Sequence, residues 1–359
     1  MKKAGIVTFH HSQSYGALLQ TYALQQFMLD NGIDTQVVNY RCAFLEDRAH
    51  PFRYIKGWGF RKYAASMLYA QQITAMRRKV DAFGREHLRM TAPCTPETVA
   101  ERTEEMDLLI TGSDQVFNPS CAGFDPVYFL EFAPDHKKYS YAASFGTATI
   151  PEEKQDAYRQ RLEGFQCLSI REESGRDLVK ELTGRESQIH VDPTFLLTKE
   201  QWDAFLPGKV RKPYIFLFTV LKPKRLVQYA LELSEKTGLP IVCLGYRHKV
   251  RDKRITYIDS VPANEFVELI KNAAYVCTNS FHGNAFSLIY RKQFIVETDA
   301  CFGENNRSKE LMQRLGLSSR VLAGENWPEM EQTTDWSVVE TYLNQERERS
   351  REYLLTAAK

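Results

Sequence analysis

Short apolar runs alternate with helical patterns along most of the chain. At its start, residues 4–9 are mostly apolar, residues 16–31 carry apolar side chains at helical spacing, and residues 35–40 are again apolar. Gly32 follows the helical segment, where a glycine commonly ends a helix. Strand, helix and strand in so short a stretch predict a βαβ unit, which requires a parallel sheet covered on both faces.

The alternation runs through two series of predicted elements. A helical, basic and aromatic insertion interrupts the first series at about residues 50–90. The first series then continues with strands at residues 107–111, 139–144, 167–170 and 188–191. A connection with prolines and a glycine, residues 192–212, precedes the second series. The second series comprises strands at residues 214–219, 241–244, 275–277 and 294–297 and helices at residues 226–237, 263–272 and 284–290.

Two open α/β series predict two domains. The chain has 359 residues, and one hydrophobic core seldom serves more than about 250 to 300. We expect two Rossmann-like domains, residues 1–200 and 213–330, with parallel sheets facing a cleft.

Polar loops follow the predicted strands. Because the carboxyl ends of parallel strands lie at one edge of a sheet, where open α/β folds bind ligands, these loops favour an active cleft. Ordinary turn chemistry would account for about half of them. The loops comprise residues 10–16, 112–115, 144–147, 171–175, 192–194, 245–248 and 279–284.

The most informative loop contains His282, which stands where a predicted strand ends and a helix begins. Unpaired backbone N–H groups at such a point hold a phosphate or carboxylate, and an imidazole carries a proton near neutral pH. The alternative is that Ser280 is only a helix N-cap and His282 a packed, hydrogen-bonded side chain.

Composition excludes several classes of protein. A net charge of +2 gives no bulk argument for a nucleic-acid partner. Seven cysteines stand singly without a C-x-x-C pair, which predicts reduced thiols in a cytoplasmic protein without a zinc site. No apolar run reaches the ~18 residues of a membrane span, and the first run lacks a signal-peptide cleavage site.

Neither series has a G-x-G-x-x-G after its first strand, which disfavours a nicotinamide oxidoreductase.

An ordered set of motifs between residues 4 and 320 is similar to the polysaccharide pyruvyl transferase family. After His11, these are YGALLQ at 15–20, GSDQVFNP at 112–119, ASFG at 143–146, SIREESG at 169–175, VDPT at 191–194, SFHG at 280–283 and residues 305–317. The resemblance implies a fold like the two-domain GT-B glycosyltransferases, with a C-terminal helix at residues 334–359 joining the first domain. It also implies transfer of the enolpyruvyl unit of phosphoenolpyruvate onto two hydroxyls of one sugar, which forms a pyruvate ketal in a cell-surface polysaccharide or its lipid-linked precursor.

The resemblance and the residue types together suggest a donor site. Phosphoenolpyruvate carries a phosphate and a carboxylate, which call for cationic groups, and one positioned acid must protonate its methylene carbon. We assign His282 as that acid or as the phosphate-facing group, and Arg171 as a donor-binding cation, with a surface ion pair to Glu172 or Glu173 as its alternative. Ser280 stands where some relatives have an arginine, and Arg247 or Arg307 could supply that charge. The predicted donor-binding residues are Arg171, Arg247, Ser280, His282, Gly283 and Asn284.

The acceptor side is expected near the N-terminus. Asp114 is the candidate base for the sugar hydroxyls, and Tyr15 could stack on a sugar ring. The alternatives are that Ser113 or Asp114 caps a turn and that Tyr15 packs at a helix start. The predicted acceptor-binding residues are His10, His11, Tyr15, Gly16, Ser113 and Gln115.

Two further patches and two rival functions stay open. The basic run 247–254 could attract a diphosphate-linked acceptor or be a solvated loop. The insertion at residues 52–63 could rest on an anionic membrane surface or cap the sheet as an amphipathic helix. The rival functions are a glycosyltransferase that uses a nucleotide sugar and a non-catalytic relative that binds a saccharide or a partner protein. The expected reaction needs phosphoenolpyruvate as co-substrate and no cofactor or metal.

Overall fold

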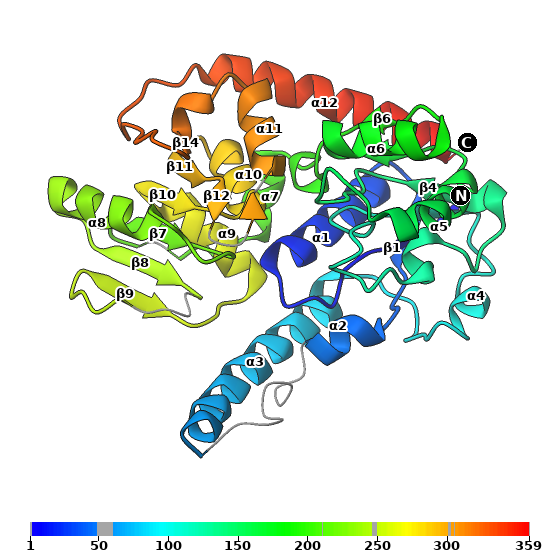
Figure 1. Cartoon of the computed structure of the whole chain (residues 1–359), viewed down its shortest axis with the longest axis horizontal. Coiled ribbons are helices and arrows are strands. Elements are labelled where there is room, and N and C mark those ends of the chain that lie inside the picture. The colour runs from blue at the N-terminus through cyan, green and yellow to red at the C-terminus, as the bar shows by residue number, and fades with distance from the viewer. Residues whose placement is uncertain are drawn as a thin grey trace. The chain divides into compact units, whose positions relative to one another are not determined.

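The computed structural model describes residues 2–48, 60–209, 211–245, 250–300, 303–304 and 306–358. By its internal contacts the chain divides into two compact units (Figure 1). Unit 1 comprises Met1–Leu196 and Gln345–Lys359, and unit 2 comprises Leu197–Asn344. The main sheet of each unit is entirely parallel, which confirms the predicted α/β class with two Rossmann-like units.

Unit 1 contains a four-stranded sheet and a short two-stranded ladder. In chain order its elements are β1 (Lys3–Val7), α1 (Tyr15–Asp30), β2 (Asp34–Val37), α2 (Ala43–Arg48), α3 (Phe60–His87), α4 (Val99–Arg102), β3 (Leu108–Thr111), the 3-10 turns η1 (Pro126–Phe129) and η2 (Asp135–Lys137), β4 (Lys138–Ser140), α5 (Glu152–Glu163), β5 (Ser169–Ile170), α6 (Glu173–Thr183), β6 (Gln188–Ile189) and η3 (Pro193–Phe195). The last turns of α12 (Trp336–Ala357) complete the unit.

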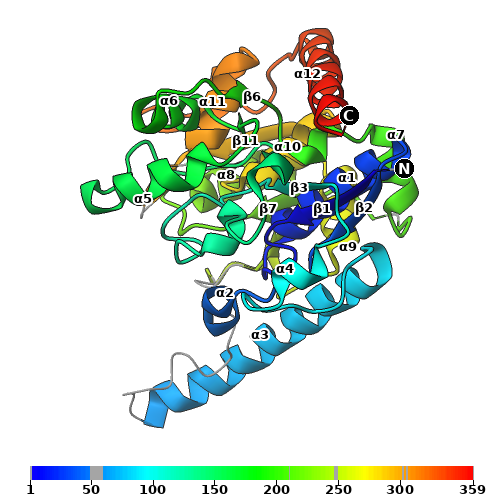
Figure 2. The ribbon, with the colours of Figure 1, turned by 90° about the vertical axis from the view of Figure 1, so that its right-hand side faces the viewer.

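The strand order of unit 1 locates its candidate ligand edge. The sheet runs β2-β1-β3-β4, and backbone bridges from Tyr139 to Cys167 and from Ala143 to Ile170 link β4 to the β5-β6 ladder. The chain therefore turns to opposite sides of β1, because β2 pairs with one edge of that strand and β3 with the other (Figure 2). In open α/β sheets, ligands bind beyond the carboxyl ends of the strands at such a switch point.

Unit 2 contains a six-stranded parallel sheet. Its elements are α7 (Lys199–Phe205), β7 (Ile215–Phe218), α8 (Leu226–Thr237), β8 (Ile241–Leu244), β9 (Ile255–Ile258), α9 (Ala263–Asn272), β10 (Tyr275–Thr278), α10 (Phe281–Ile289), β11 (Gln293–Glu297), β12 (Asp299–Ala300), β13 (Gly303–Glu304), α11 (Asn306–Arg314), the 3-10 turn η4 (Ser318–Arg320), β14 (Val321–Leu322) and the first turns of α12.

The order of these strands is that of a doubly wound nucleotide-binding fold. The sheet runs β14-β11-β10-β7-β8-β9, which is 6-5-4-1-2-3 when the parallel strands are counted along the chain. Its switch point lies between β7 and β10. All four residues of β7 are buried, as expected for a central strand covered on both faces.

The C-terminal segment returns to unit 1 and packs beside β4. Tyr353 of α12 is buried, and its hydroxyl donates a hydrogen bond to the carbonyl oxygen of Ser140 at 2.7 Å. Its ring lies 4.6 Å from that of His190, measured between ring centroids. The end of α12 is therefore part of the packed interior of unit 1.

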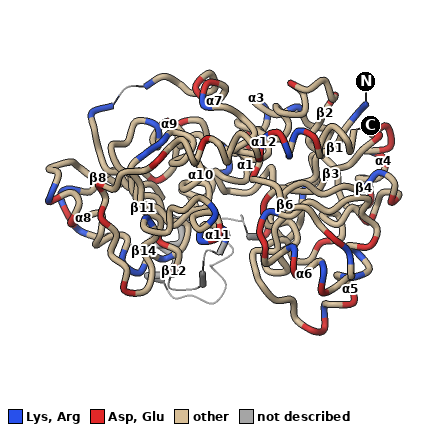
Figure 3. The backbone as a smooth tube through the Cα atoms, turned by 90° about the horizontal axis from the view of Figure 1, so that it is seen from above, with Lys and Arg blue, Asp and Glu red and all other residues tan. Residues whose placement is uncertain are grey.

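Charged residues of both signs occur along the described chain of each unit (Figure 3). Lys and Arg are interspersed with Asp and Glu along the tube of each unit, in keeping with the net charge of +2 (Figure 3). Among the helices of the described residues, none combines the length and the apolarity that a bilayer crossing requires.

The packing of α12 generates a prediction for stability. Replacing Tyr353 by Phe removes one buried hydrogen bond, so the free energy of unfolding should fall by about 1 kcal/mol. Replacing Tyr353 by Ala also leaves a cavity and should cost about 3–5 kcal/mol. Urea unfolding measures both, with Tyr139→Phe on β4 as the control. Equal effects of the two Tyr353 variants would show that the ring does not pack in the core.

Candidate functional site

Buried hydrogen bonds fix the loops after β1 and β3 at the switch point of unit 1. The hydroxyl of Thr8 donates to the carbonyl oxygen of Ser113 at 3.1 Å. The side chain of Gln20, from α1, donates to the Thr8 hydroxyl at 2.9 Å and accepts from the Ser113 N–H at 3.2 Å. Since all three residues are buried, the two loops are held against each other without help from solvent.

Asp114 stands in the loop after β3 and lines a small cavity. Its φ of 66° lies in the left-handed region, which aspartate tolerates better than most residues. Its carboxylate accepts a hydrogen bond from the N–H of Gln115 at 2.9 Å, and its side chain is 13% exposed. The cavity has a volume of about 260 Å³ and is lined by Phe9, Ser12, Gln13, Leu45, Asp114, Gln115 and Cys121.

Arg171 is buried among three carboxylates. Its guanidinium is 2.5 Å from the carboxylate of Asp192, 3.4 Å from that of Asp114 and 3.9 Å from that of Glu172. Burial lowers the pKa of Arg171, but the charges of Asp192, Asp114 and Glu172 outweigh burial and raise the pKa above its usual value. The predicted alternative, a surface ion pair with Glu172 or Glu173, is therefore replaced by a buried cluster that includes Glu172.

The partners of Arg171 are themselves held by the surrounding loops. Asp192 accepts hydrogen bonds from the N–H and the hydroxyl of Thr194 at 3.0 and 2.8 Å. Glu172 accepts from the Ser144 hydroxyl at 2.8 Å and from the Phe145 N–H at 3.0 Å. The cluster therefore joins four of the polar loops that the sequence placed at one sheet edge. The donor-binding role of Arg171 stays a prediction, and its single positive charge is already faced by three negative ones.

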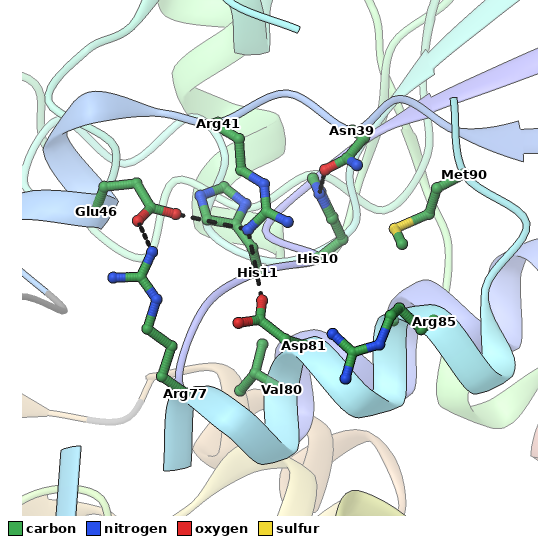
Figure 4. A pocket seen from close by; sticks show the side chains of 11 residues that line it. His10, His11, Asn39, Arg41, Glu46, Arg77, Val80, Asp81, Arg85 and Met90 are labelled. Carbon is green, nitrogen blue, oxygen red and sulfur yellow. Dashed lines mark hydrogen bonds and ion pairs between the residues drawn. The ribbon is translucent and has the colours of Figure 1, made fainter. Parts of the chain in front are cut away.

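His10 and His11 line a second and larger cavity of unit 1. It has a volume of about 630 Å³, and helix α3 forms one wall of it (Figure 4). Burial lowers the pKa of His10 to about 4 and that of His11 to about 2, so both imidazoles are neutral near pH 7. The ring nitrogens of His10 lie 3.2 Å from the Thr8 carbonyl oxygen and 3.2 Å from the Asn39 side-chain oxygen.

The other predicted acceptor residues lie in the packed interior. Tyr15 and Gly16 form the first turn of α1 and are buried. The hydroxyl of Ser113 donates to the carbonyl oxygen of Ala142 at 2.7 Å and is fully buried. None of these three lines either cavity. The structure thus brings Asp114 and Gln115 together in one cavity and His10 and His11 in the other.

Hydrogen bonds from side chains also hold the strand ends and loops together at the switch point of unit 2. The Thr278 hydroxyl at the end of β10 donates to the carbonyl oxygen of Phe218 at the end of β7, at 2.8 Å. The side-chain oxygen of Asn279 accepts from the N–H of Val220 at 2.8 Å. A Cβ on Gly283 would lie 2.5 Å from the Thr278 hydroxyl oxygen, so glycine is required for α10 to approach the strand.

The first turn of α10 carries the predicted donor residues of unit 2. Ser280 is its N-cap, with a hydroxyl that accepts from the Gly283 N–H at 3.3 Å, and His282 is 6% exposed. The side-chain amide of Asn284 is fully buried, and neither its oxygen nor its nitrogen has a hydrogen-bond partner within the described residues. The guanidinium carbon of Arg307 lies 5.5 Å from the centre of the Phe281 ring. Arg247 lies outside the described residues.

A carboxylate that was not predicted from the sequence fills the N-terminus of α8. Glu297, at the end of β11, is fully buried, and one of its oxygens accepts from the N–H groups of Lys224, Arg225 and Leu226 at 3.1, 2.7 and 3.2 Å. Burial raises the pKa of Glu297 above its usual value, although these three N–H groups oppose that shift. The phosphate position of the first βα turn in unit 2 is therefore occupied by a side chain of the protein.

No group of three or more His, Cys, Asp or Glu side chains in the described ranges is arranged to hold a metal ion.

The buried histidine generates a prediction for pH dependence. The pKa of His10 is about 4 in the folded protein and about 6.5 in an unfolded chain. The unfolded state therefore binds more protons between these values, and His10 destabilises the fold as pH falls from 6.5 to 4. Replacing His10 by Gln should reduce the slope of unfolding free energy against pH in this window by up to about 1.4 kcal/mol per unit.

Chemical unfolding at several pH values measures this slope. The exposed His136 provides a matched control, and His136→Gln should keep the slope of the wild-type protein. An unchanged slope in His10→Gln would mean that His10 is not held neutral by burial.

Solved structures with the same architecture include nucleotide-sugar enzymes. Arabidopsis thaliana UGT89C1 in complex with UDP-L-rhamnose is similar at 10% identity, with 99% of this chain and 98% of that chain covered and a TM-score of 0.52. UDP-GlcNAc 2-epimerase from Methanocaldococcus jannaschii is similar at 15% identity, with 99% and 100% covered and a TM-score of 0.47. At 10% identity the likeness to UGT89C1 concerns the fold alone, which is GT-B-like.

The sequence comparisons identify the family. No curated protein matches the chain. The family model of polysaccharide pyruvyl transferases matches residues 15–298, a stretch that includes the loops after β3, β4, β5 and β10. This match confirms the resemblance inferred from the ordered motifs. The chain therefore belongs to the polysaccharide pyruvyl transferase family, a family of transferases.

Proposed function

We propose that this protein transfers the enolpyruvyl unit of phosphoenolpyruvate onto two hydroxyls of one sugar, in a cell-surface polysaccharide or its lipid-linked precursor. Family membership supports the reaction class. The observation that carries the assignment of roles is the carboxylate of Asp114, which Arg171 holds at the switch point of unit 1 and which lines a cavity there.

The reaction needs one acid, one base and an anion site. A proton adds to the methylene carbon of phosphoenolpyruvate, and a sugar hydroxyl attacks the resulting cationic carbon and loses its proton to the base. The bond from that carbon to the phosphate oxygen then breaks, and the second hydroxyl closes the ketal. Of the two hydroxyl protons, one replaces the proton given to the methylene carbon and the other leaves with inorganic phosphate.

Asp114 is the proposed base for the acceptor hydroxyls. It is a carboxylate with partial solvent access, whereas Asp192 and Glu172 are buried and engaged by backbone and hydroxyl donors. Arg171 is a positioning residue in this proposal, because its ion pair orients the carboxylate of Asp114. Gln115 and Gln13 line the same cavity and supply side-chain amides that can bind sugar hydroxyls.

The proposed donor site is the first turn of α10 in unit 2. It follows the strand at the switch point, and its N-terminal N–H groups favour an anion. Asn284 offers a buried amide whose missing hydrogen bonds cost about 1–3 kcal/mol per group, a cost that the polar groups of a ligand would relieve. His282 is the proposed acid, and Arg307 on α11 brings a positive charge beside Phe281. That charge takes the place of an arginine that some relatives have at the position of Ser280 and that this chain lacks.

Glu297 disfavours one position for the diphosphate of a nucleotide sugar. In Rossmann-like folds, the N-terminus of the helix after the first strand holds the phosphates of a nucleotide. In unit 2 this position is the N-terminus of α8. There the Glu297 carboxylate accepts hydrogen bonds from the N–H groups of the helix. At the N-terminus of α8, a diphosphate would have to displace this buried carboxylate.

Ligand binding tests the donor assignment. Phosphoenolpyruvate at about 100 times its dissociation constant should stabilise the protein by about 2.7 kcal/mol, whereas UDP-glucose should not stabilise it. His282→Gln should lose the protection by phosphoenolpyruvate, and His136→Gln should keep it. Thermal unfolding measures all four results, and protection by UDP-glucose would favour the glycosyltransferase instead.

Kinetics tests the role of Asp114. Asp114→Asn should lower kcat by about 10²- to 10⁴-fold, because a neutral amide cannot take the hydroxyl proton, while the KM for phosphoenolpyruvate should change little. Phosphate release that depends on a saccharide acceptor measures turnover. Asp156→Asn, with a side chain 86% exposed, is the control for loss of one carboxylate. A wild-type kcat in Asp114→Asn rules out Asp114 as the base.

A further inference from the structure

The larger cavity of unit 1 has a charge pattern that the proposed reaction does not use. Three arginines, Arg41, Arg77 and Arg85, and two carboxylates, Glu46 and Asp81, line it. With His10 and His11 neutral, these groups leave one positive charge in excess. The reacting atoms of a ketal-forming sugar need no such charge, so the cavity requires a separate explanation.

An ion-pair chain holds two of the arginines in place. Arg77 pairs with Glu46 at 2.5 Å, and Arg41 stands between Glu46 at 3.6 Å and Asp81 at 3.7 Å (Figure 4). Arg85 makes no ion pair within the described residues, although it lines the same cavity. Arg77, Asp81 and Arg85 recur every four residues and so share one face of α3. The excess charge is therefore assigned to Arg85.

The neutral histidines add groups that suit hydroxyls. His11 is 8% exposed, and neither of its ring nitrogens has a hydrogen-bond partner within the described residues. A neutral imidazole offers one donor and one acceptor, which is the pattern that a hydroxyl can satisfy. Carboxylates such as Glu46 and Asp81 accept hydrogen bonds from hydroxyls as well.

We infer that this cavity is an acceptor subsite for a sugar unit that carries an oxyanion, either a carboxylate or a phosphate. Arg85 pairs with the oxyanion, and the carboxylates and histidines contact the sugar hydroxyls. A volume of about 630 Å³ falls within the range of small-molecule sites, about 300–1,000 Å³.

The loop after β1 connects this subsite to the proposed reaction. His10 and His11 face the larger cavity, whereas Phe9, Ser12 and Gln13 of the same loop line the cavity of Asp114. A saccharide whose reacting sugar occupies the Asp114 cavity can place a neighbouring sugar in the larger one. In this respect the inference rests on the proposed function, because it assumes a saccharide acceptor.

Calorimetric titration without phosphoenolpyruvate tests the subsite separately from turnover. The probes are glucuronic acid, N-acetylglucosamine 1-phosphate, neutral N-acetylglucosamine and inorganic phosphate. At least one charged sugar should bind about tenfold tighter than the neutral sugar, as expected for a charge-assisted hydrogen bond. The charged sugar that binds more tightly identifies the oxyanion as carboxylate or phosphate.

Variants on one helix provide matched controls. Arg85→Gln should reduce the affinity for the charged sugar to that for the neutral one, and Arg85→Lys should keep most of the preference. Arg78→Gln removes the same charge from an exposed neighbour on α3 that does not line the cavity, and it should change nothing. Thermal unfolding of each variant checks that it is folded.

Three results would overturn the inference: equal binding of charged and neutral sugars, equal effects of Arg85→Gln and Arg78→Gln, or inorganic phosphate binding as tightly as the sugar phosphate. Absence of pyruvyl transfer together with Arg85-dependent sugar binding would contradict the proposed function alone. Transfer to neutral saccharides without any effect of Arg85 would contradict the subsite alone.

Discussion

The buried ion pairs of Arg171 are the constraint on which unit 1 depends. A charged guanidinium is costly to bury, and here Asp192, Asp114 and Glu172 compensate it. Backbone and hydroxyl donors bind the second oxygens of Asp192 and Glu172. Removal of one partner from such a cluster typically costs about 3–5 kcal/mol, because an uncompensated charge stays behind. The cluster therefore links the ends of β5 and β6 to the loop after β3 and fixes the carboxylate that we assign as the base.

In both units the candidate residues lie at a switch point of the sheet. Hydrogen bonds from buried polar side chains hold the neighbouring loops together there. Thr8 and Gln20 tie the loops in unit 1, and Thr278 and Asn279 tie them in unit 2. In unit 2, the two helix N-termini at the switch point differ in whether a side chain occupies them. In unit 2, Glu297 fills the N-terminus of α8, so the N-terminus of α10 is the one that carries the proposed donor chemistry.

Features that depend on local sequence pattern, such as helices, were predicted. Features that depend on contacts between distant residues were not. The predicted helices at 226–237 and 263–272 coincide with α8 and α9, because their apolar spacing is local. The strand β9 was missed because it has four residues directly after a basic run. Glu172 was named from the sequence as an alternative partner of Arg171, but Asp114 and Asp192 were not predicted as partners, since they are 57 and 21 residues away. The spacing of Arg77, Asp81 and Arg85 by four on a predicted helix indicates that they share one face of it. This pattern could have pointed to the charged wall of the larger cavity.

The central claim is that an enolpyruvyl unit becomes a ketal on a sugar. Phosphoenolpyruvate labelled with carbon-13 at its second carbon, incubated with the wild-type protein and a saccharide acceptor, tests this directly by NMR. We expect a quaternary ketal carbon covalently attached to the saccharide, with release of one inorganic phosphate for each ketal. Consumption of the label to free pyruvate, or transfer of a hexose from a nucleotide sugar while the label stays intact, would contradict it.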